Sequence, residues 1–191
     1  KAGGSIVYKE RELSIDNFDF MIARPDEVRL GGDPNNLLIP ENIYNDGVGT
    51  YVTGTFQGSN SYSGTIQNIG FYVSGELALT EKFKAILGVR AEKYSHRYTG
   101  GNQDWFNSEG AQGIFLDDEE ILESFKPFPT ANLIYSLNDD SNLRASYTRT
   151  IARPSFKENA IAQIFDPLSN TFWIGNPDLD EADINNIDLR Y

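Results

Sequence analysis

The most constraining feature of this sequence is an alternation of apolar and polar side chains over residues 68–79. The apolar or small residues occupy the odd positions, Ile69, Phe71, Val73, Gly75, Leu77 and Leu79. The even positions between them carry mostly polar or small residues. Successive side chains of a β-strand point to opposite faces of its sheet. The pattern therefore predicts a strand with an apolar environment on one side and a polar environment on the other.

A second alternating segment follows almost at once. The polar residues 80–82 interrupt the pattern, and apolar side chains then return at every second position from Phe83 to Ala91. Two long strands joined by a short polar turn form an antiparallel hairpin.

The same arrangement recurs later in the chain. Residues 129–137 and 143–148 alternate in the same way, and Asp139-Asp140-Ser141-Asn142 joins them with residue types that favour turns. Residues 187–191 begin a further strand. Residues 5–23 indicate an earlier strand or a pair of strands, because the apolar positions change parity along this segment.

Long irregular connections separate these hairpins, over residues 24–49, 100–125 and 156–184. In the second connection, the acidic run Asp117–Glu120 is followed by apolar residues and is interpreted as a short capped helix. A regular exchange of short turns and long loops is typical of outer-membrane β-barrels, which have short periplasmic turns and long extracellular loops. We therefore expect an all-β fold, an antiparallel transmembrane β-barrel segment of about six or seven strands that occupies residues 1–191. A soluble β-sandwich is the alternative fold.

Composition excludes several other classes. The chain has 28 acidic and 16 basic side chains and a net charge of −12, so no nucleic-acid partner is expected. It has no cysteine and one histidine, His96, so cysteine-based metal sites and motifs that require two histidines are excluded. No apolar run approaches the roughly 20 residues of a membrane-spanning helix. We expect no catalytic residues, no metal and no cofactor.

Three phrases in the second half resemble the barrel of TonB-dependent outer-membrane receptors, in particular those of Bacteroidetes. They are Ala145-Ser-Tyr-Thr-Arg-Thr-Ile-Ala-Arg-Pro-Ser-Phe-Lys-Glu158, Gly175-Asn-Pro-Asp-Leu179 and Asn186-Ile-Asp-Leu-Arg-Tyr191. The hairpin around Gly88-Val-Arg90 is similar to one in the same barrels, and the resemblance covers roughly residues 65–191. It implies a barrel of about 22 strands closed around a plug domain. The chain then corresponds to an internal fragment of the barrel, which lacks the plug and the first and last barrel strands.

The resemblance implies a function as an outer-membrane nutrient uptake receptor in which this segment forms barrel wall and ligand-capturing extracellular loops. The expected partners are the remaining strands and plug, the TonB energy-coupling complex, outer-membrane lipid, and a small-molecule, glycan or peptide substrate. The alternative function is a secreted β-sandwich that binds carbohydrate through Trp105 and Trp173, and a hydrolase that uses paired acids is a third hypothesis.

Five residues are candidate ligand contacts. Trp105, Phe106 and Trp173 lie in the long connections, where aromatic rings can stack on a sugar or can simply pack within their loop. Arg149 and Arg153 lie at the outer end of a strand, next to Pro154, which cannot donate to a strand ladder. A further set of polar residues on the predicted lumen side is expected to form an ion-pair network or to bind a polar substrate: Glu76, Arg90, Glu92 and Arg144.

Overall fold

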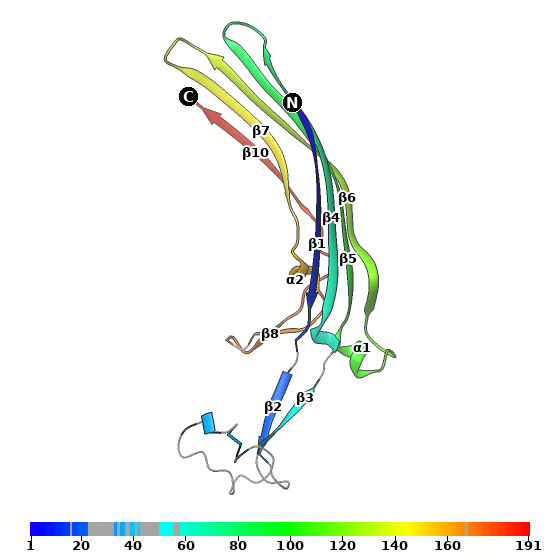
Figure 1. Ribbon diagram of the computed structural model, residues 1–191. Coiled ribbons are helices and arrows are strands. Elements are labelled where there is room, and N and C mark those ends of the chain that lie inside the picture. The colour runs from blue at the N-terminus through cyan, green and yellow to red at the C-terminus, as the bar shows by residue number, and fades with distance from the viewer. Residues whose placement is uncertain are drawn as a thin grey trace.

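The computed structural model consists of one long curved β-sheet with small helices and hairpins at one end (Figure 1). It describes residues 1–15, 17–22, 33, 35, 36, 39, 40, 42, 50–55, 58–166 and 168–191. The main sheet has six strands in the order β1-β4-β5-β6-β7-β10. Their bounds are β1 Ala2–Leu13, β4 Tyr62–Ala78, β5 Phe83–Gly101, β6 Phe115–Ser136, β7 Asn142–Ala152 and β10 Ala182–Arg190.

Two smaller sheets lie in the connections. Strands β2 (Asn17–Ile22) and β3 (Thr50–Thr55) form one hairpin, and β8 (Ile164–Asp166) and β9 (Thr171–Trp173) form the other. The helical elements are short, namely the 3-10 turn η2 (Gly58–Asn60), α1 (Gln103–Asn107) and α2 (Phe156–Asn159). Among the described residues, no helix has the length and apolar character needed to cross a membrane.

Every pairing in the main sheet is antiparallel. Strands β4 and β5 pair along their whole length, and Thr80 closes the turn between them by accepting a hydrogen bond from the Phe83 backbone at 2.9 Å. The turn between β6 and β7 closes through Asn138, which accepts from the Ser141 hydroxyl at 2.7 Å. Both predicted hairpins are therefore confirmed, and their short turns lie at the same end of the sheet (Figure 1).

The register places one parity of each strand on a common apolar face, which we call the outer face. Phe71 lies opposite Ala91, Val73 opposite Val89 and Leu133 opposite Ala85, so the apolar positions align from strand to strand. Its exposed side chains form a continuous band across all six strands: Ile6, Phe71, Val73, Leu77, Leu87, Val89, Leu133, Tyr135, Leu143, Tyr147, Ile187 and Leu189. A continuous exposed apolar band of this kind is typical of the lipid-facing surface of an outer-membrane barrel.

The sequence interpretation was wrong about the acidic run Asp117–Glu120, which belongs to strand β6 and not to a helix. Strand β5 continues to Gly101, and its outer half needs a hydrogen-bonded neighbour, so this acidic segment pairs with it through two register shifts. Asp118 has a backbone φ of 51°, in the left-handed region, and its carboxylate accepts a hydrogen bond from Arg97 Nε at 2.8 Å. The predicted loop 100–125 is therefore shorter, since β5 and β6 are separated only by residues 102–114.

The first part of the chain contains two strands, since β1 ends at Leu13 and β2 begins at Asn17. The change of apolar parity falls within β1 and not at this boundary, because Ile6 and Tyr8 have the outer-face parity whereas Leu13 has the inner-face parity and packs against the buried cluster around Tyr62. Most of the predicted connection 24–49 lies outside the described residues.

The described sheet does not close into a barrel. Its two edge strands, β1 and β10, each pair with a single neighbour. The described strands also form one main sheet rather than two sheets packed face to face, so the sandwich alternative is not supported. The only cluster of buried apolar side chains in the described part of the chain lies where the connection between β7 and β10 meets β4 and β5.

Candidate functional site on the inner face

The connection between β7 and β10, residues 153–181, folds back onto the face opposite the apolar band, which we call the inner face. Figure 1 shows α2 on the hollow side of the curved sheet. The strand β7 ends at Ala152, two residues before Pro154, which has no backbone N–H to continue the ladder. Ser155 then caps α2, and it forms a capping box with Glu158, whose carboxylate accepts from the Ser155 backbone at 2.7 Å.

Apolar contacts hold this inward-folded loop on the sheet. The Phe156 ring packs edge-on against the buried His96 ring of β5, with ring centroids 4.9 Å apart. Gly64 of β4 permits this approach, because a Cβ there would lie 2.9 Å from the Phe156 ring. The segment that follows, residues 160–162, is buried with Tyr62 and Tyr98. Burial of these side chains stabilises the position of the loop over β4 and β5.

The Gly175-Asn-Pro phrase closes the base of the loop against α2. The Gly175 backbone donates to Ala160 O and the Asn176 backbone donates to Glu158 O, both at 2.7 Å. A Cβ at Gly175 would lie 2.4 Å from Glu158 O, so the close approach requires glycine. The fully buried Asn159 also points its amide toward the Asn176 carbonyl, at 3.4 Å.

An ion-pair cluster ties both ends of the loop to the strands. Arg153 Nε donates to Glu181 Oε1 at 2.7 Å, and Arg153 Nη1 donates to Glu92 Oε2 of β5 at 3.0 Å. The guanidinium carbon of Arg153 lies 4.3 Å from the centre of the Tyr94 ring. Glu92 also accepts from Arg90 Nε at 2.5 Å. The first residue of the connection is thus joined to its last residue and to the middle of β5.

The cluster extends across the gap between β6 and β10. Lys126 Nζ lies 3.0 Å from Glu181 and 3.3 Å from Asp183, and Arg149 Nη2 lies 3.1 Å from Asp183. The Glu181 side chain has no exposed surface. Burial alone would raise the pKa of Glu181, but the hydrogen bonds that its carboxylate receives from Arg153, Ser124 and Lys126 outweigh burial and hold that pKa below its ordinary value of 4.5.

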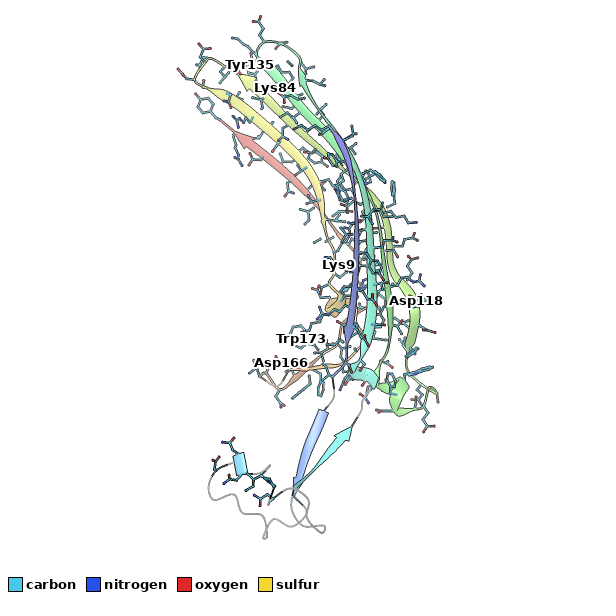
Figure 2. All side chains as sticks on the ribbon, viewed as in Figure 1. Lys9, Lys84, Asp118, Tyr135, Asp166 and Trp173 are labelled. Atoms are coloured by element: carbon cyan, nitrogen blue, oxygen red, sulfur yellow. The ribbon has the colours of Figure 1, made fainter. Side chains whose placement is uncertain are left out.

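The predicted site residues fall into two groups. Arg149 and Arg153 belong to one ion-pair cluster. Trp173 lies on the connection between β7 and β10 and is 55% exposed, and Lys157 Nζ lies 4.4 Å from its ring centre. Trp105 and Phe106 lie apart from these on α1 and pack around Phe115, with ring centroids 5.5 and 6.3 Å away. Figure 2 labels Trp173 beside the loop on the hollow side of the sheet.

The expected lumen network is divided in the structure. Arg90 and Glu92 are joined as expected, whereas Glu76 pairs with Lys84 at 2.7 Å and Arg144 donates to Asn142 at 2.8 Å. The sequence interpretation missed Glu181 and Lys126, which connect the cluster. Strand parity could have placed Lys126 on the inner face, but nothing in the local pattern of Glu181 indicates a buried carboxylate.

In the part of the chain that the structure describes, no group of three His, Asp or Glu side chains could hold a metal ion. The polar centre of this site is an ion-pair cluster whose carboxylates are neutralised by Arg and Lys. Such a cluster can fix the loop and can present charged donors to a ligand.

Residues 8–191 match the family model described as TonB-dependent receptor-like, β-barrel. The chain belongs to this family of TonB-dependent receptor barrels. The family consists of outer-membrane receptors and transporters rather than enzymes, which agrees with the apolar outer face and polar inner face of the sheet. Searches of curated proteins and of solved structures found no match.

Proposed function

We propose that this chain is a wall segment of a TonB-dependent nutrient uptake receptor, an internal fragment of a larger barrel of the kind found in Bacteroidetes. The observation that carries the proposal is the family match over residues 8–191 on a sheet with one apolar and one polar face. In the complete receptor, further strands pair with the edges β1 and β10, and a plug domain fills the lumen. The TonB complex acts on the receptor through that plug.

In this proposal the long connections capture the ligand at the outer surface. Trp173 offers an exposed ring for stacking, and Arg149 and Arg153 hold the loop that carries it. Trp105 and Phe106 form a second aromatic group on the β5–β6 connection. Uptake then follows from differential binding, because the ligand binds more tightly to the state with the loops closed over it than to the state in which the displaced plug has opened the passage. The substrate is a small molecule, a glycan or a peptide.

A labelling experiment tests the placement of the wall. The chain has no cysteine, so Val73→Cys on the outer face and Ser74→Cys on the inner face can each carry a single fluorophore within this segment. We expect brominated lipid to quench the label at position 73 and not the label at position 74 in the reconstituted receptor. Equal quenching at both positions would rule out a barrel wall.

A growth experiment tests uptake. A strain that lacks the receptor gene is profiled on iron chelates, cobalamin, glycans and peptides. We expect loss of growth on one class, restored by the gene and dependent on a working TonB protein. Restoration of growth by the gene in a strain without a working TonB protein would contradict the proposal. Trp173→Ala should then weaken uptake of that class, with Phe165→Ala on the facing strand β8 as its control.

A further inference from the structure

The inner face carries a pocket that the ion-pair cluster does not fill. It has a volume of about 910 Å³ and lies between β1, β4, β5 and the start of the inward-folded loop. The residues that line this basic pocket include the cations Lys9, Arg11 and Arg153, the acidic residue Glu10, and Ile66, Asn68 and Phe156. This volume is in the range of sites that bind small molecules.

Two of its cations, Lys9 and Arg11, have no carboxylate partner among the described residues. Lys9 and Arg11 share the parity of Ser5, which receives a hydrogen bond from the inner-face Arg90 at 2.9 Å, so both point to the inner face. No acidic group among the described residues lies within ion-pair distance of either one. Their acidic neighbours in the strand, Glu10 and Glu12, have the opposite parity, which directs both side chains to the outer face, although Glu10 also contributes to the lining of the pocket.

Two further carboxylates near the pocket, Glu92 and Glu181, are already paired. Glu92 is shared by Arg90 and Arg153, and Glu181 is shared by Arg153 and Lys126. Arg153 nevertheless keeps one buried donor atom, Nη2, without a hydrogen-bond partner in the described structure, and Asn68 keeps a buried acceptor, Oδ1. In a chain of net charge −12, the pocket thus gathers three cations, Lys9, Arg11 and Arg153, against the acidic lining residue Glu10.

The walls of the pocket are not only charged. Ile66 and the Phe156 ring supply apolar surface next to the cations. A ligand that fits both parts has an anionic group, which ion pairs can hold, and an apolar body, which can lie against the rings and aliphatic side chains. Figure 2 shows Lys9 on β1 and Trp173 on the connection at the hollow side of the sheet.

We propose that the basic pocket binds the carboxylate group of a small amphipathic ligand, with Lys9 and Arg11 as the binding cations and Ile66 and Phe156 as the apolar wall. This inference rests on the proposed uptake function and adds the chemical class of the ligand. Arg153 has a double role, because it holds the loop through Glu181 and also lines the pocket.

The test uses the full-length receptor in lipid nanodiscs and two probes of similar shape, 3-phenylpropionate and the neutral 3-phenylpropan-1-ol. Saturation-transfer difference NMR measures the dissociation constant of each. We expect the acid to bind at least about tenfold more tightly than the alcohol, and we expect added salt to reduce the difference. Lys9→Gln/Arg11→Gln should weaken acid binding about tenfold without changing alcohol binding.

The matched control is Lys82→Gln, in the turn between β4 and β5 and outside the pocket, which should leave the acid affinity unchanged. Equal binding of acid and alcohol, no binding of the acid, or no effect of the double variant would overturn the proposal. Binding that appears only after deletion of the plug domain would also overturn it, because the cations would then be partners of the plug. These readouts need no transport, so a growth phenotype that depends on TonB would survive failure of this inference.

Discussion

The two long connections of the described sheet are stabilised in different ways. The connection between β5 and β6 packs on itself, since Trp105 and Phe106 of α1 surround Phe115 at the start of β6. Its helix is capped by Asn102, only three residues before the bonded Trp105 backbone. The connection between β7 and β10 instead depends on partners far away in the sequence, including Glu92 and His96 of β5. The first loop is a local structure, and the second is part of the barrel's inner face.

The length of a connection therefore does not determine how firmly it is held on the sheet. The base of the β7–β10 connection is held by buried ion pairs, buried apolar residues and close backbone contacts. Its tip, the β8–β9 hairpin, exposes Leu168, Phe172 and Trp173. A rigid base can therefore present an exposed aromatic tip at a fixed position, which limits the entropy lost when a ligand binds. The following predictions test this comparison in the full-length receptor.

The largest effect is expected for Glu181→Gln. The substitution leaves Arg153 and Lys126 without their shared buried carboxylate, and breaking a buried ion pair costs about 3 kcal/mol. Hydrogen exchange should show that residues 153–163 lose protection, whereas residues 102–114 keep theirs. Unchanged protection of the β7–β10 connection would show that apolar contacts alone hold it. Asp188→Asn on β10, whose carboxylate pairs with Arg190 at the surface, is the control.

Acidification should reproduce part of this loss. The pKa of Glu181 is lower in the folded receptor than in the unfolded chain, so the group stabilises the fold above its ordinary value of 4.5. That contribution is lost as the pH falls below 4.5 and through the lower folded pKa. Hydrogen exchange between pH 7 and pH 3, corrected for intrinsic rates, should show this loosening in the wild type and a smaller change in Glu181→Gln. If the wild type and Glu181→Gln showed the same transition, the loosening would have to come from the titration of other groups.

A smaller effect is expected for Gly175→Ala, at about 2 kcal/mol, because the new Cβ meets backbone carbonyl oxygens that cannot rotate away. The control is Gly75→Ala in β4, where nothing lies within 4 Å of the added Cβ. Limited proteolysis should cleave the β7–β10 connection faster in the first variant and at the wild-type rate in the second. Equal cleavage of both variants would show that the close approach at Gly175 is not needed.

The smallest effect is expected for Trp105→Ala. The half-buried ring contacts Phe115 within its own loop, and its removal should cost about 1.5 kcal/mol locally. Protection should fall only in residues 102–114, and the Glu92–Arg153 contact should persist. If the β7–β10 connection also lost protection, the two connections would have to be regarded as one cooperative unit.

Much of the fold could be predicted from the sequence because strand parity is a local property. The alternation over residues 68–79 and the two polar turns identified both central hairpins and the two faces of the sheet. The acidic run at Asp117–Glu120 was misinterpreted as a helix because its local composition suits a helix start. The acidic run forms a strand because the long strand β5 needs a hydrogen-bonded neighbour along its outer half.

The site could be predicted only in part. Arg153 and Trp173 were found from their motif and their residue type, but the carboxylates that position Arg153 lie 61 residues before it and 28 residues after it in the sequence. No periodicity connects positions so far apart. Asn159 and Gly175 likewise gain their roles only when the loop turns back on α2.

The sequence by itself determined that the chain forms long antiparallel strands with one apolar and one polar face, because side chains alternate with a period of two whatever the rest of the chain does. The tertiary structure alone decided which polar residues meet on the inner face. Ion pairs and pockets depend on the register between strands and on the path of the connections, which bring Lys9, Glu92, Arg153 and Glu181 to the same region from four distant parts of the chain.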